Sequence, residues 1–326
     1  MVYTLLKASI FLILSPWFYF MLSFLKGIVE LMRPAEWSKS LLNMAIAVAF
    51  AGFMYNISFS YELFLLGAAS VCLLWSGLYT LNDYTDRFED AAHPLKKIRA
   101  IPSGRVPASF ALFLSISLIA ISFSLGFLIA FSTKNFLFII CLLAMLINQI
   151  LYTMKPFNFK KRPIVDLISG SLVNPTFRFY AGWTLFVPHL NAPPLALLFI
   201  MGLQFGGYGI YRLMSEEHDK NRKYRSSVAL YGDRLKPIFY ASLAISVFAF
   251  FFACANSIIN IPGIGALPLR YLILVFLSAL PAPYYLHVLK NPKNVDNIKS
   301  YRLIYRLLYV HSFLFMLGFL LLYTLF

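Results

Sequence analysis

Long apolar segments alternate with short polar segments along most of the 326-residue chain. An apolar segment of about 20 residues can cross the hydrocarbon core of a bilayer as a helix. The apolar segments and the polar breaks between them predict nine transmembrane helices, at residues 40–58, 61–82, 107–132, 135–154, 164–187, 193–212, 236–258, 264–288 and 302–326. The predicted fold class is therefore an all-α membrane protein with nine transmembrane helices.

A further apolar segment, residues 8–25, precedes the nine predicted spans. It could form a tenth span, a signal anchor, or an interfacial helix, which Pro16 and the aromatic run Trp17–Phe20 would suit. It lacks a small-residue cleavage site of the Ala-x-Ala kind, which argues against removal as a signal peptide. We therefore divide the chain into an N-terminal hydrophobic anchor or interfacial helix, residues 1–29, and a transmembrane domain, residues 30–326.

The composition excludes a soluble protein, because apolar residues make up 60% of the chain and charged residues only 13%. A soluble domain has roughly 25% charged residues. The net charge of +15 would suggest a nucleic-acid partner in a soluble protein. Here all basic residues except Lys7, Lys134, Arg178 and Arg270 lie in segments on one side of the predicted spans. The positive-inside rule places those segments in the cytoplasm, so topology accounts for much of the charge and no nucleic acid is expected.

The helix of the second predicted span is expected to continue beyond residue 82, and three carboxylates and an amide share one face of this extension. Asn82, Asp83, Asp86 and Asp90 fall within about 100° of one another on a helical wheel. Crowded carboxylates at a membrane boundary repel one another and are costly to bury, and a hard divalent cation removes that cost. Mg²⁺ prefers oxygen ligands and commonly bridges carboxylates to substrate phosphates. The pattern indicates a Mg²⁺–diphosphate site, although a solvated helix end, with Arg87 paired to the acids, would give the same pattern.

A basic loop follows the acidic motif directly. Pro94 ends the helix, and Pro102 lies in a turn. Between them, Lys96, Lys97 and Arg99 supply positive charge that can bind phosphate next to the carboxylates. Acids followed at once by bases are what a cation-bridged diphosphate site requires.

The segment Asn82-Asp83-x-x-Asp86-x-x-x-Asp90, followed by Arg99-Ala100-Ile101-Pro102-Ser103-Gly104, resembles the first signature of the UbiA prenyltransferase superfamily. That signature is an Asn-Asp-x-x-Asp-x-x-x-Asp motif followed by a loop ending in Arg-Pro-Ile-Pro-Ser-Gly or Arg-Pro-Ile-Ala-Ser-Gly, so Ala100 replaces the usual proline. The resemblance covers residues 30–326. It implies a nine-helix intramembrane bundle with its active site facing the cytoplasm, in a bacterial or archaeal plasma membrane.

Three weaker features resemble the polyprenyl-phosphate phosphoribosyltransferase branch of this superfamily. They are the segment from Arg33 to Lys39, the sequence His93-Pro94-x-Lys96, and Arg178. Positive-inside anchoring would explain Arg33 and Lys39 equally well. Arg178 lies inside a predicted span, where an arginine costs roughly 2.5–3.5 kcal/mol at mid-helix. We therefore expect Arg178 to meet an anion, either a substrate phosphate or a carboxylate such as Asp166.

The polar loop after the sixth predicted span departs from the family pattern. Most prenyl-diphosphate members of the family carry a second Asp-x-x-x-Asp motif there, which this chain lacks. On a helical wheel one face instead carries two acids and three bases: Arg212, Glu216, Asp219, Lys220 and Lys223. This face could bind one Mg²⁺ through Glu216, with phosphate held by the bases. Alternatively, pairs such as Glu216–Lys220 and Asp219–Lys223 could neutralise it. The departure weakens the case for two metals and for the usual prenyl-diphosphate donor.

The resemblance implies a transferase in which Mg²⁺ assists the loss of diphosphate from an electron-poor carbon. The expected reaction is transfer of a polyprenyl group from polyprenyl diphosphate to an acceptor. The first alternative is phosphoribosyl transfer from phosphoribosyl diphosphate to polyprenyl phosphate. Two alternatives of another class are a lipid transporter and a scaffold that holds anionic lipid. A transporter needs a polar path across the membrane, and the outward half of the predicted spans offers almost none. The expected partners are the lipid bilayer, a polyprenyl phosphate or diphosphate, and a small co-substrate.

The expected site residues have three roles. The catalytic set is Asp83, Asp86, Asp90, Glu216 and Asp219. The metal ligands are Asn82, Asp83, Asp86, Asp90 and Glu216. The substrate-binding residues are Arg33, Lys39, Asn82, Lys96, Lys97, Arg99, Lys155, Arg178, Lys220 and Lys223.

Overall fold

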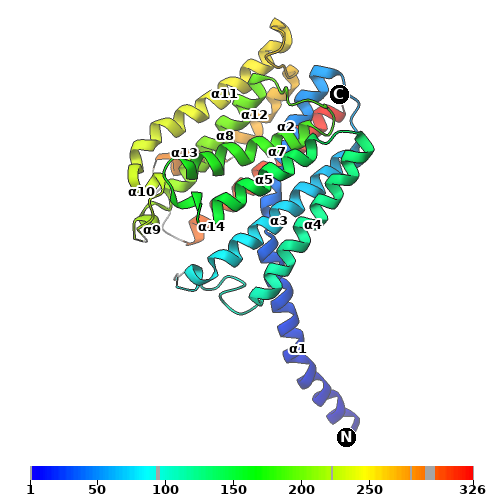
Figure 1. Cartoon of the computed structure of the whole chain (residues 1–326), viewed down its shortest axis with the longest axis vertical. Coiled ribbons are helices and arrows are strands. Elements are labelled where there is room, and N and C mark those ends of the chain that lie inside the picture. The colour runs from blue at the N-terminus through cyan, green and yellow to red at the C-terminus, as the bar shows by residue number, and fades with distance from the viewer. Residues whose placement is uncertain (1, 93–95, 222, 280, 291–297, 326) are drawn as a thin grey trace. The chain divides into compact units, whose positions relative to one another are not determined.

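The structure is a computed structural model that describes residues 2–92, 96–221, 223–279, 281–290 and 298–325. Within these ranges the chain is helical and contains no strand (Figure 1), which confirms the predicted all-α class. The α-helices are α1 (Val2–Met32), α2 (Trp37–Tyr55), α3 (Tyr61–Ala91), α4 (Ala108–Thr133), α5 (Leu137–Thr153), α6 (Val165–Ile168), α7 (Asn174–Trp183), α8 (Pro194–Leu213), α9 (Glu216–Asn221), α10 (Ser227–Tyr231), α11 (Lys236–Ile259), α12 (Leu274–Ala279), α13 (Ala282–Lys290) and α14 (Ile298–Thr324).

Six helical segments of the described chain are long and apolar enough to cross a membrane: Trp17–Tyr55, Tyr61–Ala91, Ala108–Thr133, Pro194–Leu213, Ser227–Ile259 and Arg306–Thr324. The predicted count of nine is not confirmed, because the other three predicted spans are short or broken. Helix α5 has 17 residues. The span predicted at 164–187 is interrupted by a π-helix, Ser169–Val173. The span predicted at 264–288 is divided between α12 and α13 near Pro281.

The chain divides into two compact units, and α3 and α4 contribute to both. Unit 1 comprises Met1–Pro34 and Leu73–Ile121, and unit 2 comprises Ala35–Cys72 and Ser122–Phe326. The predicted boundary between residues 29 and 30 falls inside α1, which continues to Met32. The assignment of an N-terminal anchor and a separate catalytic domain therefore stays a prediction.

In unit 1, helix α1 ends against α3. The hydroxyl groups of Ser76 and Thr80 on α3 donate to the carbonyl oxygens of Met32 and Leu31, at 2.8 and 3.3 Å. These bonds satisfy carbonyl groups that a helix end leaves without intrahelical partners. Leu31 is buried with Ala100, Ile101, Val106 and Ala111, so the last turn of α1, the basic loop and the start of α4 share one small core.

Helices α3 and α4 lie side by side in unit 1 (Figure 1), and their contact is close at Gly77. The Ser115 hydroxyl donates to the Gly77 carbonyl oxygen at 2.8 Å. A Cβ atom at Gly77 would lie 2.9 Å from the Ser115 carbonyl oxygen. Only a residue without a side chain allows this approach, which holds the polar end of α3 beside α4.

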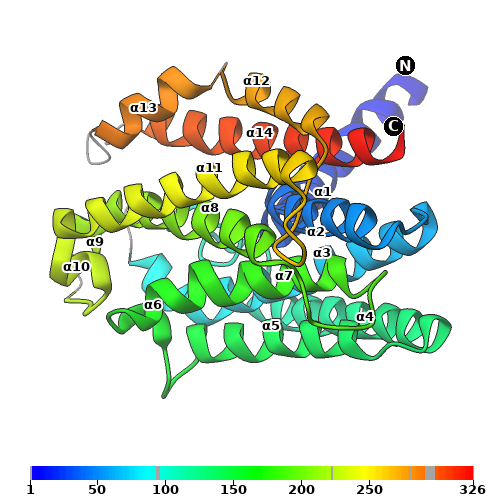
Figure 2. The same ribbon diagram turned by 90° about the horizontal axis from the view of Figure 1, so that it is seen from above.

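In unit 2, the core is built by α2, α7, α8, α11 and α14. Its largest fully buried side chains include Phe50, Phe179, Trp183, Tyr271 and Phe319. Figure 2 shows α8 and α11 running alongside each other. Glycines on α8 make this packing close, because Cβ atoms at Gly202 and Gly206 would lie 2.7 Å from carbonyl oxygens of α11. The polar segments between α8 and α11 are thereby held at one end of a rigid helix pair.

Candidate functional site

The acidic motif lies on the polar end of α3, which continues as one helix from Tyr61 to Ala91. Asp83 and Asp90 are buried, with exposed fractions of 5% and 2%, while Asn82 and Asp86 are half-buried. The Asn82 amide donates to Asp86 Oδ2 at 3.3 Å. The predicted helical arrangement of these four residues is therefore present, and two of the carboxylates are buried.

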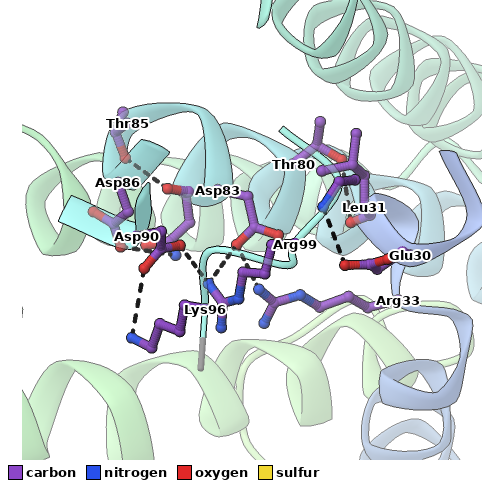
Figure 3. Close-up of polar contacts among 12 residues, drawn as sticks. Glu30, Leu31, Arg33, Thr80, Asp83, Thr85, Asp86, Asp90, Lys96 and Arg99 are labelled. Atoms are coloured by element: carbon purple, nitrogen blue, oxygen red, sulfur yellow. Dashed lines mark hydrogen bonds and ion pairs between the residues drawn. The ribbon is translucent and has the colours of Figure 1, made fainter. Parts of the chain in front are cut away.

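Three bases converge on the two buried carboxylates. Arg33 Nη2 lies 2.5 Å from Asp83 Oδ1, and Arg99 Nη1 donates to Asp83 Oδ1 at 3.2 Å and to Asp90 Oδ2 at 2.8 Å. Lys96 Nζ lies 3.7 Å from Asp90 Oδ1. We call these five residues the first polar cluster (Figure 3). Charge-assisted hydrogen bonds offset the cost of burying the carboxylates.

Arg33 reaches this cluster through an unusual backbone conformation. It follows the last residue of α1 with a φ angle of 49°, in the left-handed region, and its backbone N–H donates to the Val29 carbonyl oxygen at 3.1 Å. A left-handed residue commonly ends a helix and reverses the chain. The Arg33 guanidinium also lies 5.1 Å from the centroid of the Tyr79 ring on α3. The end of α1 therefore directs a cation onto the acidic face of α3.

Arg99 is held by the folded basic loop, residues 96–106. Backbone bonds close successive turns in this loop, from Arg99 N–H to the Lys96 carbonyl and from Ser103 N–H to the Arg99 carbonyl, at 2.9 and 3.0 Å. Gly104 has a φ angle of 74°, which few residues other than glycine adopt readily. The predicted turn is confirmed, whereas His93 and Pro94 of the sequence His93-Pro94-x-Lys96 lie outside the described residues.

Sequence reasoning missed Glu30, which lies three residues before Arg33 on the last turn of α1. Its Oε1 atom accepts a hydrogen bond from the Ala100 backbone N–H at 3.2 Å, and its Oε2 atom lies 2.5 Å from Arg105 Nη2. An acid at the end of an apolar helix is common next to water. The only sequence signal was its closeness to Arg33, which does not indicate a contact with a loop 70 residues further along.

The remaining predicted substrate-binding residues are distributed over both units. Lys97 is exposed in the basic loop of unit 1, and Lys155 is exposed in unit 2. The Nζ atom of Lys39, also in unit 2, lies 2.7 Å from Glu36 Oε2 and 5.3 Å from the centroid of the Tyr309 ring. Arg178 is buried on α7. The assignment of these residues to substrate binding stays a prediction.

The second polar loop does not form the single helix that the wheel assumed. Helix α8 ends at Leu213 and α9 runs only from Glu216 to Asn221, so Lys223 lies beyond the helix. Asp219 accepts hydrogen bonds from Arg212 at 2.5 Å and from the Ser226 hydroxyl at 2.6 Å, in place of the expected pair with Lys223. The interruption at residues 214–215 turns the chain, and this turn brings Asp219 to Arg212.

Three further contacts complete this second polar cluster, defined as Asp166, Arg212, Asp219, Ser226 and Ser227. Asp166 is fully buried and accepts hydrogen bonds from the Ser227 hydroxyl and, at 3.0 Å, from the Ser227 backbone N–H. It lies 3.9 Å from Arg212. Beside the cluster, Glu216 pairs with the partly exposed Lys220 at 2.6 Å, as the self-neutralising alternative predicted. The cluster thus ties α6 to the ends of α8, α9 and α10.

The donors on α3 suit a hard cation in their chemistry, since Asn82, Asp83, Asp86 and Asp90 offer oxygen ligands. In the part of the chain that the structure describes, however, no group of three His, Cys, Asp or Glu side chains is arranged to hold a metal ion. Arg99 donates to both Asp83 and Asp90, so a guanidinium balances these two charges. The metal-ligand roles of the α3 residues and of Glu216 stay predictions.

The apolar helices of spanning length, together with charged clusters at helix ends, define an all-helical integral membrane protein. The sequence model of the UbiA prenyltransferase family matches residues 42–316. The chain belongs to this family, which confirms the predicted resemblance and the predicted class of transferases.

Solved structures of the family share the fold. A UbiA homologue from Archaeoglobus fulgidus bound to DMAPP and Mg²⁺ has a TM-score of 0.66 and 19% sequence identity, covering 92% of this chain and 100% of that one. The same homologue bound to GPP and Mg²⁺ gives a TM-score of 0.64 with the same identity and coverage.

The curated relatives match a shorter part of the chain. The decaprenyl-phosphate phosphoribosyltransferase of Mycolicibacterium smegmatis is 35% identical over 83 residues, which is 25% of this chain and 26% of that protein. The enzyme of the same name from Mycobacterium tuberculosis is 31% identical over 90 residues, 25% of this chain and 28% of that protein. The matched segment thus spans about a quarter of the length of these relatives.

Proposed function

We propose that this protein transfers a phosphoribosyl group from phosphoribosyl diphosphate to a polyprenyl phosphate. A phosphate oxygen of the lipid attacks the anomeric carbon C1 of the ribose, the bond from C1 to the diphosphate oxygen breaks, and diphosphate leaves. The names of the curated relatives support this reaction. So do the features at Arg33–Lys39 and Arg178, which resemble the same branch of the superfamily.

The observation that carries the proposal is the state of Asp219 in the second polar cluster. Asp219 is 3% exposed and is bonded by Arg212 and Ser226, so its charge is balanced within the protein. Arg212 is itself only 15% exposed, so this ion pair is closed to solvent, whereas the bases that pair with Asp83 and Asp90 are 28–29% exposed. Since the second acidic motif of prenyl-diphosphate members is absent and Asp219 is engaged, a donor that needs two acidic motifs fits this chain less well.

The first polar cluster offers positive charge to a substrate instead. The side chains of Arg33 and Arg99 are 28% and 29% exposed, and that of Lys96 is 37% exposed, whereas Arg212 is only 15% exposed. Partly exposed bases can bond phosphate oxygens while they stay next to the acids. Phosphoribosyl diphosphate carries a 5-phosphate in addition to its diphosphate, so it matches a site that is rich in such bases.

We assign roles on this basis. Arg33, Lys96 and Arg99 bind phosphate oxygens and orient the diphosphate, with Lys97 at the edge of the loop. Mg²⁺ held by Asn82, Asp83, Asp86 and Asp90 would neutralise charge that develops on the leaving diphosphate. Within unit 2, Lys39, Lys155, Arg178, Lys220 and Lys223 are proposed to bind the lipid phosphate or the ribose phosphate, with Glu216 paired to Lys220 and Asp219 next to Lys220 in sequence.

The proposed membrane arrangement keeps all nine predicted spans. The short helix α5 and the two interrupted segments, at 164–187 and 264–288, would cross the membrane as short or bent helices. The distribution of basic residues supports a site that faces the cytoplasm. A π-helix inside a span is compatible with crossing, because such bulges occur within continuous helices and are frequent at functional sites. The expected partners are then a polyprenyl phosphate within the bilayer and a water-soluble phosphoribosyl diphosphate.

Polyprenyl transfer from a polyprenyl diphosphate is the second candidate. It is favoured by the fold, since the Archaeoglobus fulgidus structures of the same fold were solved with DMAPP or GPP and Mg²⁺. In that reaction the diphosphate leaves an allylic carbon and the acceptor attacks there.

One split assay separates the candidates. Purified protein in lipid nanodiscs with Mg²⁺ is given radiolabelled phosphoribosyl diphosphate and decaprenyl phosphate, and separately labelled geranylgeranyl diphosphate and 4-hydroxybenzoate. We expect labelled lipid only in the first reaction. Product only in the second would contradict the proposal and support prenyl transfer. Labelled substrate that crosses sealed proteoliposomes without conversion would instead support a transporter.

A further inference from the structure

The basic loop is fastened to the end of α1 by one carboxylate. Both oxygens of Glu30 are used: Oε1 accepts from the backbone N–H of Ala100 at 3.2 Å, and Oε2 accepts from Arg105 Nη2 at 2.5 Å. Ala100 directly follows Arg99, the residue that bridges Asp83 and Asp90 (Figure 3). A carboxylate on α1 therefore fixes the peptide group next to the bridging guanidinium.

Arg105 extends this fastening across the loop. Its Nη2 atom donates to the Ile98 carbonyl oxygen at 2.8 Å, and its Nε atom donates to the Ser103 hydroxyl at 3.1 Å. Ile98 precedes Arg99 and Ser103 follows it, so Arg105 bonds the loop on both sides of Arg99. The Glu30–Arg105 pair thus defines the backbone path from which the Arg99 side chain extends.

Arg33 follows directly after the last turn of α1, and its guanidinium and that of Arg99 both bond Asp83 Oδ1. We propose that Glu30, acting through the Ala100 N–H and Arg105, is a positioning residue that sets Arg99 beside Arg33 for diphosphate binding. This inference rests on the proposed function for its substrate, while its structural part concerns only the loop. Glu30 itself bonds the loop and touches no reacting atom.

We expect the protein to fold without this carboxylate. The Glu30 side chain is 40% exposed, and the loop is also held by the buried side chains of Leu31, Ala100, Ile101 and Val106. An exposed ion pair by itself contributes at most about 1 kcal/mol. Removing the carboxylate should therefore leave the protein folded while it frees the backbone around Arg99.

Glu30→Ala is the test variant, and Glu62→Ala is the matched control. Glu62 is also an exposed acid, but it lies in the first turn of α3, at the end of that helix opposite the acidic motif. Hydrogen–deuterium exchange in nanodiscs should show faster exchange of peptides covering residues 98–106 in the Glu30 variant alone. Binding of inorganic diphosphate in the presence of Mg²⁺, measured by calorimetry, should weaken about tenfold, the change that loss of one charge-assisted hydrogen bond produces.

Turnover adds a readout that simple destabilisation does not reproduce. For Glu30→Ala the KM for phosphoribosyl diphosphate should rise about tenfold with kcat changed much less, whereas a smaller folded fraction would lower kcat alone. Glu30→Gln, which keeps an acceptor for the Ala100 N–H, should recover part of the affinity. Unchanged exchange, or faster exchange with unchanged diphosphate binding, overturns the proposal. Absence of product from the unaltered protein with either substrate pair counts against the proposed function only, because exchange and diphosphate binding are measured without turnover.

Discussion

Replacing Arg99 with methionine would remove the only guanidinium that the described residues place on both Asp83 and Asp90. Arg99 bonds Asp90 at 2.8 Å and Asp83 at 3.2 Å. A hydrogen bond to a charged group contributes roughly 1.5–3 kcal/mol. Asp83 keeps its bond to Arg33 at 2.5 Å, so the main loss falls on Asp90, which is 2% exposed and has Lys96 at 3.7 Å. Because Arg99 is itself 29% exposed, solvent screening reduces the effect, and we expect a loss of about 2 kcal/mol in the free energy of unfolding.

A double-mutant cycle tests this reasoning. Asp90→Asn removes the buried charge that Arg99→Met leaves unbalanced, so the double variant should regain most of the lost stability and show a coupling of about 1–2 kcal/mol. Denaturant titration in detergent micelles, followed by tryptophan fluorescence, measures the free energy of unfolding. Lys97→Met, a change at an exposed base of the same loop, is the matched control and should leave it nearly unchanged.

Catalysis should respond differently from stability in the same cycle. Since the proposed site needs both the acid and the base, the double variant should stay inactive although it is stable again. Additive stability losses in the double variant, or an Arg99→Met protein as stable as the unaltered one, would refute the bridging role.

Three further predictions follow from contacts within single units. Asp86→Asn should abolish turnover while the protein still inserts and elutes as a single species in size-exclusion chromatography, whereas full turnover would exclude a role in binding the metal. Arg212→Met should lower the free energy of unfolding by about 3 kcal/mol because it leaves Asp219 buried without its cation, and thermal unfolding in detergent would measure this loss. Gly182→Ala should cost about 1–3 kcal/mol because the new Cβ atom would lie 2.5 Å from the backbone of α2. Gly207→Ala on α8, where a Cβ atom meets nothing within 4 Å, should cost nothing in the same measurement, and equal losses at the two glycines would contradict the packing argument.

Much of the helical arrangement could be predicted because the length of an apolar segment directly reflects the thickness of a bilayer. The segment predicted at 40–58 appears as α2, Trp37–Tyr55, and that predicted at 193–212 as α8, Pro194–Leu213. The prediction was less accurate at 164–187, where hydrophobicity does not reveal the π-helix at Ser169–Val173. Hydropathy records burial in lipid, but it carries little information on the hydrogen-bond register within a helix.

The candidate site was predictable only where its residues are neighbours in sequence. Asn82, Asp83, Asp86 and Asp90 share a helix, so their common face follows from the helical period. The contact between Arg33 and Asp83 joins residues 50 positions apart and depends on how α1 ends against α3. No spacing rule predicts such a contact. The wheel for the second loop failed because it assumed a helix that continues through residues 214 and 215.

The close packing of α8 against α11 places different evolutionary constraints on neighbouring glycines. Cβ atoms at Gly202 and Gly206 would meet carbonyl oxygens of α11, which every residue possesses, so no substitution on α11 can make room for them. The three atoms nearest to a Cβ atom at Gly209 all belong to the ring of Phe239. Among homologues with this packing, position 209 is therefore free to change together with position 239, whereas positions 202 and 206 are confined to glycine as long as the two helices remain this close.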